Sequence, residues 1–144
     1  MKKEYWIHVA HVDNRLVIYL NGNTIWDSGI VHDDPQLNQY IEITEQLEHN
    51  VPHTSELIFE GFNDDYKTED NADDLNPWHF EYRLFVRNLE DNGKLINEVD
   101  MIKPYNEKHL SNPNTRAINN SYQIVKKDRE FKVISNALSQ QFYR

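Results

Sequence analysis

Alternation of apolar and polar side chains over residues 78–87 constrains the fold more than any other feature of this chain. A period of two puts successive side chains on opposite faces of a β-strand. One face then carries large apolar groups and the other mostly polar ones, as in a half-buried antiparallel sheet. We therefore predict a central core strand with Trp78, Phe80, Tyr82, Leu84 and Val86 on its dry face and His79, Glu81, Arg83 and Arg87 on its wet face.

Shorter runs of β-forming residues predict further strands on both sides of this segment. Asn21 and Gly22 tolerate positive φ at both turn positions, so residues 16–26 are expected to form a hairpin. A single helical turn is expected from Thr44 to Leu47, before Pro52. The remaining strands are expected over residues 5–12, 37–43, 56–62, 94–102 and 122–125.

The chain beyond Pro104 is the least regular part of the pattern. Residues 106–120 are polar and loop-like, whereas Phe131, Ile134, Leu138 and Phe142 have the spacing of one helical stripe over residues 128–143. We therefore expect an all-β protein, an antiparallel β-sandwich of the jelly-roll type with a short C-terminal helix. Residues 1–103 would form its body, and residues 104–144 a basic segment packed on the same domain.

The net charge of −9 is distributed unevenly along the 144 residues. Residues 1–100 hold 21 acidic residues against 7 lysines and arginines, and residues 101–144 hold 3 against 8. An acidic body repels phosphate backbones and anionic lipids, so neither nucleic acid nor a membrane surface is an expected partner. The basic segment would lie across the body or meet an acidic partner.

The absence of certain residues and motifs argues against several kinds of enzyme. No cysteine is present, and four glycines in the whole chain leave almost none to cradle a phosphate. Carboxylate pairs for glycoside hydrolysis are defined by their spacing in space, and the sequence selects none. We expect a non-catalytic protein. It carries no signal peptide and no bilayer-spanning segment, so we expect it in the cytoplasm unless it is exported by a route without a cleaved signal.

Four segments in order resemble the galactose-binding-like jelly-roll domains, including the sugar-binding domain of glycoside hydrolases. They are residues 12–13, 17–22, 41–47 and 56–63, in which a strand ends in Asn-Gly and a later strand leads into an Ile-Thr turn followed by a leucine. The resemblance covers residues 10–65 and implies a jelly roll with a sugar ligand. The chain departs from it at Glu42, where aspartate is usual.

Residues 63–76 contain six acidic residues and one lysine, a composition that suits a cation. Calcium takes six to eight oxygen ligands, which a loop rich in Asp and Asn between two strands can supply. The order Asp64, Thr68, Asn71 is similar to the calcium loop of calcium-dependent galactophilic bacterial lectins; a solvated acidic loop is the alternative. The candidate metal ligands are Asp64, Asp65, Thr68, Asp70, Asn71, Asp73 and Asp74.

Aromatic and amide side chains near this segment could complete a sugar site, because sugars stack on aromatic rings and bond to fixed polar groups. Tyr66 lies inside the polar segment, whereas the parity of Trp78 also suits the core. The candidate ligand-binding residues are Tyr66, Trp78, Asn76, His79 and Trp26. We therefore predict a lectin-like module for carbohydrate, assisted by calcium.

A protein-interaction domain is the alternative function, in which the acidic face docks a basic protein partner as inhibitors and immunity proteins do. Trp26 and Tyr40 would then serve as anchors. An exposed sandwich edge could equally pair two copies into a homo-oligomer. Among the seven histidines, His8 and His11 are three residues apart and cannot share a metal on one strand face without a bulge.

Overall fold

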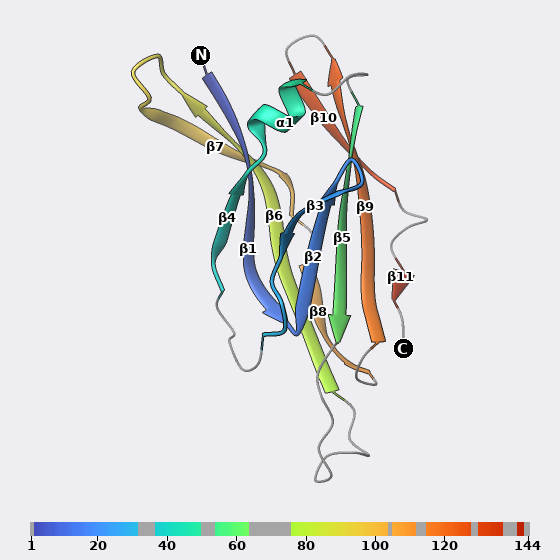
Figure 1. Ribbon diagram of the computed structural model, residues 1–144. Coiled ribbons are helices and arrows are strands. Elements are labelled where there is room, and N and C mark those ends of the chain that lie inside the picture. The colour runs from blue at the N-terminus through green and yellow to red at the C-terminus, as the bar shows by residue number, and fades with distance from the viewer. Residues whose placement is uncertain are drawn as a thin grey trace.

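Two antiparallel sheets face each other in the computed structural model, as predicted (Figure 1). The structure describes residues 2–31, 37–49, 54–63, 76–103, 105–111, 115–127, 130–136 and 141–142. In this part of the chain the first sheet has the order β4-β1-β6-β7, with β8 also pairing with β6. The second has the order β10-β9-β5-β2-β3, with β11 pairing with β9.

The elements follow one another along the chain with short connections between several of them. Within the described ranges there is one short helix, α1 (Thr44–His49), which covers one end of the space between the sheets, and its Leu47 is buried (Figure 1). The strands are β1 (Lys2–Asp13), β2 (Arg15–Leu20), β3 (Asn23–Asp27), β4 (Gln39–Glu42), β5 (Thr54–Asn63), β6 (Asn76–Leu89), β7 (Leu95–Ile102), β8 (Tyr105–Ser111), β9 (Thr115–Lys127), β10 (Glu130–Ser135) and β11 (Gln141–Phe142).

The core between the sheets is made by the inward faces of β1 and β6 on one side and β2, β5 and β9 on the other. The predicted dry face of β6 is confirmed for Phe80, Tyr82, Leu84 and Val86, all of which are buried. The side chain of Trp78 lies outside the described part. Gly61 in β5 lets the two sheets approach closely, because a Cβ atom there would stand 2.7 Å from Cζ of Phe80.

Aromatic packing and one polar contact also join the sheets. The ring of Tyr82 stacks on Phe59 of the opposite sheet at a centroid distance of 3.8 Å. Its hydroxyl accepts a hydrogen bond of 2.6 Å from Nδ2 of Asn120, which is buried as well. A buried amide that is satisfied across the core helps to fix how the sheets lie on each other.

The chain after Pro104 differs from the expectation in two places. The polar residues predicted as loop-like include strand β8 and the first half of β9. The predicted C-terminal helix is wrong for the described residues, because 130–135 form strand β10, paired with β9 from Glu130–Lys127 to Ser135–Tyr122. Phe131 packs edge-on against Tyr5, with the ring centroids 4.6 Å apart. The segment alternates in burial as a strand does, instead of burying one helical stripe. Among the described residues, no helix is long and apolar enough to span a bilayer.

Candidate functional site

A β-bulge in β1 decides which side chains reach the outer face of the first sheet. The pairing of β1 with β6 shifts between Val9, opposite Tyr82, and His11, opposite Glu81, so that Ala10 is the extra residue. Directly opposed residues of an antiparallel pair project to the same face. The bulge therefore brings His11 to the face that already carries His8.

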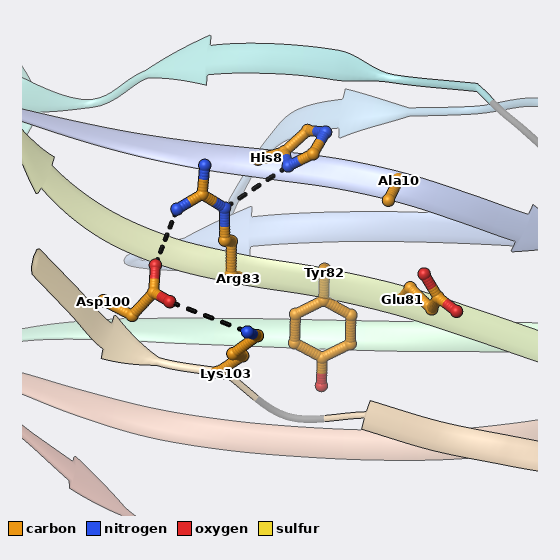
Figure 2. Close-up of a pocket in the computed structure, with 7 residues that line it drawn as sticks. All are labelled: His8, Ala10, Glu81, Tyr82, Arg83, Asp100 and Lys103. Atoms are coloured by element: carbon orange, nitrogen blue, oxygen red, sulfur yellow. Dashed lines mark hydrogen bonds and ion pairs between the residues drawn. The ribbon is translucent and has the colours of Figure 1, made fainter. Parts of the chain in front are cut away.

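A pocket of about 250 Å³ lies on this outer face, over β1, β6 and the end of β7 (Figure 2). Its volume is below the range of pockets that take drug-sized ligands, so a single small ring is the size of ligand that it suits. Charged groups of both signs converge there. The lining residues are His8, Ala10, Glu81, Tyr82, Arg83, Asp100 and Lys103.

Arg83 is held at the centre of this pocket by partners from two neighbouring strands. Its Nη1 donates a hydrogen bond of 2.6 Å to Oδ1 of Asp100 on β7, and its Nε donates one of 3.4 Å to Nδ1 of His8 on β1 (Figure 2). Lys103 Nζ lies 4.0 Å from the other carboxylate oxygen of Asp100. Arg83 is a quarter exposed, so its guanidinium is held in place and still reachable by a ligand.

The contact with Arg83 also fixes the tautomer of His8. An arginine can only donate, so Nδ1 of His8 must accept and the ring proton must be on Nε2. That nitrogen lies 3.1 Å from Oδ1 of Asn38, an acceptor. This neutral ring is therefore oriented from both sides.

An aromatic group borders the pocket on the side of β4. The ring of Tyr40 stacks on His8 at 4.3 Å, with 5° between the planes, and is half exposed. The guanidinium of Arg83 lies over the ring of Phe85 at 4.1 Å, and Phe85 meets Tyr40 edge-on at 6.4 Å. Phe85 is buried although it belongs to the outer face, so this face is partly apolar and not simply wet.

A second group of side chains adjoins the pocket through Glu81. Nε2 of His79 lies 2.8 Å from Oε1 of Glu81, and the ring of His11 lies 4.2 Å from the ring of His79. The ligand atoms of these three residues all lie within 4.8 Å of one another. The bulge makes this arrangement possible; from the sequence it was considered only as the condition for His8 and His11 to share a metal.

The residues proposed from sequence fall into three groups. Tyr66 and the seven candidate calcium ligands of residues 64–74 lie outside the described residues. Asn76 and Trp78 belong to β6, but their side chains also lie outside the described part. His79 is on the outer face of the first sheet, whereas Trp26 is on β3 of the second sheet, partly buried against the core.

The residues at the centre of the pocket were not predicted from the sequence. Arg83 was placed on the wet face of its strand but given no role, and Asp100 and Lys103 were not singled out. Together with Glu81 they form a neutral mixture of donors and acceptors, which suits a ligand with several hydroxyl groups. No family model, curated protein or solved structure matches this chain.

Proposed function

We propose that the protein is a non-catalytic binding module that takes a small, neutral, polyhydroxylated ligand of the carbohydrate class in the outer-face pocket. The observation that carries this proposal is Arg83 held between His8 and Asp100 inside a pocket of about 250 Å³. The sequence resemblance to galactose-binding-like domains supports the same class of ligand.

The charges around the pocket favour a neutral ligand over a charged one. A strongly anionic ligand would meet Glu81 and Asp100, and a strongly cationic one would meet Arg83 and Lys103. Sugar hydroxyls both donate and accept, so neighbouring hydroxyls can donate to the carboxylates and accept from the two cations.

Preorganisation is a second reason for placing the ligand here. Arg83 is already oriented by hydrogen bonds, so binding does not have to immobilise a free side chain, which costs about 0.5–1.5 kcal/mol in other interfaces. The exposed ring of Tyr40, stacked on His8, adds an apolar platform beside the polar groups.

The test uses a glycan array followed by calorimetry on matched arginine variants. Arg83→Met keeps the aliphatic stem and removes the guanidinium. Arg15→Met is the control, because Arg15 forms a similar pair with Asp27 on the second sheet, at 2.8 Å. We expect the wild type and the Arg15 variant to bind the same glycan and the Arg83 variant to lose at least about tenfold in affinity, the lower bound for losing a charge-assisted hydrogen bond. The proposal would be refuted if the wild type bound no glycan on the array, or if the Arg83 variant bound as tightly as the wild type.

The calcium site remains a separate proposal that the sequence alone supports. A thermal melt of the metal-stripped protein with and without millimolar calcium tests it, because an ion that binds only the native state raises the midpoint. A clear rise is expected if residues 63–76 ligate calcium. An unchanged midpoint would leave an acidic loop and would not affect the pocket.

Strand β7 supports protein docking as a second candidate function. It pairs with β6 on one side, and no described strand pairs with its other edge. Figure 1 shows the β6–β7 hairpin reaching away from the second sheet. Leu95, Ile96 and Val99 on this strand are 39%, 44% and 52% exposed, and an exposed apolar edge strand favours the addition of a partner strand.

The acidic surroundings of this edge favour a basic partner. Glu90 and Asp91 precede the strand at the turn, and Glu98 and Asp100 lie on it. The probe is a set of peptides that alternate lysine with apolar residues, tested by surface plasmon resonance. We expect binding that weakens steeply with salt and is lost in Val99→Lys, with Ile134→Lys on β10 as a control at another exposed apolar site. Salt-independent binding, or equal binding by the Val99 variant, would contradict it.

A further inference from the structure

The trio of His11, His79 and Glu81 has the composition of a site for a divalent transition metal. Two imidazoles and one carboxylate are nitrogen and oxygen ligands that zinc accepts, and zinc sites with three protein ligands leave a fourth position for water or another molecule. Calcium and magnesium prefer oxygen ligands alone, so this trio does not suit them. Its nitrogen ligands distinguish the trio from the acidic segment of residues 63–76, whose oxygen ligands suit calcium.

The sheet itself brings the three ligands together. His11 is directly opposite Glu81 in the pairing of β1 with β6, and His79 precedes Glu81 by two residues on the same strand face. Without the bulge at Ala10, residue 11 would project to the side of Val9, toward the core. The three residues thus converge through backbone register, which depends little on how any one side chain is turned.

The distances suit a metal ion after a small adjustment. Ligands about 2.0–2.1 Å from a tetrahedral zinc ion stand about 3.3–3.4 Å from each other. Here the three ligand atoms lie within 4.8 Å of one another, and Nε2 of His79 is 2.8 Å from Oε1 of Glu81. Binding would replace the proton between these two atoms by the ion, move them slightly apart and draw His11 inward.

The surroundings leave the trio accessible and favour a cation. The side chain of His79 is 14% exposed and that of Glu81 is 36% exposed, so solvent and an ion can reach both. Asp13 is in register with His79 on β1, so this end of the sheet face carries a further acidic residue. Glu81 also lines the pocket, so an ion held here would stand at its edge.

From this geometry we infer that His11, His79 and Glu81 bind one zinc ion or a similar divalent transition metal. The inference does not depend on the carbohydrate proposal, because it concerns the metal alone. Its test uses the full chain, stripped of metal with a chelator and titrated with zinc chloride by calorimetry. We expect one zinc per chain, and an excess of calcium or magnesium should not displace it, whether or not calcium binds elsewhere on the chain.

Substitutions show which of the seven histidines of the chain bind the metal. His11→Asn, His79→Asn and Glu81→Gln should each weaken zinc binding at least tenfold, and the double histidine variant should abolish the one-to-one isotherm. His49→Asn is the control, because His49 is an exposed histidine of α1 outside the trio. Unchanged zinc affinity in the double variant, or a wild type without one-to-one binding, would overturn the inference.

Cobalt provides a readout that a merely structural role of the three residues would not change. Cobalt substituted in a four-coordinate site absorbs strongly in the visible range, whereas cobalt in water does not. We expect this absorption in the wild type and the His49 variant. Circular dichroism on each variant distinguishes loss of the metal site from loss of the fold, and an isosteric Glu81→Gln variant that stays folded and retains full cobalt absorption would contradict the role of Glu81.

Discussion

Replacing Gly61 by alanine tests how closely the two sheets pack. A Cβ atom at this position would lie 2.7 Å from Cζ of Phe80 on the opposite sheet and 2.8 Å from Cγ1 of Ile118 on the neighbouring strand. Ordinary van der Waals contact begins near 3.4 Å, so Phe80 must retreat by about 0.7 Å. Phe80 and Ile118 are both fully buried, and side chains in a close-packed core have few voids to move into.

The expected loss of stability is the cost of overpacking the core minus the gain from restricting the unfolded chain. Extra methyl groups in a packed core cost about 1–3 kcal/mol, and replacing glycine by alanine regains about 0.4–1 kcal/mol by restricting the unfolded chain. The net loss should be about 1–2 kcal/mol. For a chain of this length that lowers the melting temperature by about 3–6 °C.

Denaturant unfolding followed by tryptophan fluorescence measures this loss of stability. A second substitution tests whether the contact with Phe80 causes it. Phe80→Leu removes the ring atoms that the new methyl group would meet. In that background, Gly61→Ala should cost clearly less than in the wild type, the coupling expected of two residues in contact. An equal cost in both backgrounds, or a Gly61→Ala protein more stable than the wild type, would refute the close approach of β5 and β6.

Three further substitutions probe individual contacts. Tyr82→Phe leaves the buried amide of Asn120 without its 2.6 Å acceptor and should cost about 1–3 kcal/mol in denaturant unfolding; a neutral result would contradict the contact. The hydrogen bond from Arg15 lowers the pKa of Asp27 below 3.8, so Asp27→Asn should cost less than about 1 kcal/mol at pH 7, and this difference should fade in melts below pH 3.8 as the carboxyl protonates. Burial, then the charges of Glu48 and Glu130, raise the pKa of Tyr5 from 10.0 to about 12. The unfolded chain ionises first, so stability should fall from pH 10 to 12 by up to about 3 kcal/mol, and Tyr5→Phe should reduce this dependence.

Much of the sandwich could be predicted because the core-facing residues of its central strand recur with a period of two. In β6 the alternation of Phe80, Tyr82 and Leu84 with Glu81 and Arg83 fixes both the strand and its faces. A half-buried strand must alternate in this way, whatever lies across the sheet. The hairpin of β2 and β3 was equally predictable from the sequence, because Asn and Gly favour the positive φ that Asn21 and Gly22 both adopt.

The bulge in β1 left a signal that is clear only in retrospect. Ile7 and Val9 are buried two residues apart, but the next buried residue is Val12, three residues on. A step of three in a period of two indicates an extra residue. His8 and His11, three residues apart, need such a bulge to share a face, and the apolar spacing shows where it lies.

The C-terminal segment was mispredicted because Phe131 fits two patterns, a helical stripe with Ile134 and a strand face with Val133. Phe131 and Ile134 are three apart and suggested a helix, yet Ile134 is exposed and Val133 packs against the core instead. Pairing with β9 decides the outcome, and such long-range pairing is not visible in a short window. The pocket was missed for the same reason, since His8, Arg83 and Asp100 meet only across three strands.

The most direct test of the account is a two-dimensional NMR titration of the labelled protein with a mixture of free monosaccharides. The central claim is that the outer face of the first sheet binds a small polyhydroxylated ligand. It predicts that the amide signals of His8, Arg83 and Asp100 shift and saturate, while those of Arg15 and Asp27 stay fixed. Unchanged spectra at saturating sugar, or shifts confined to the second sheet, would contradict it.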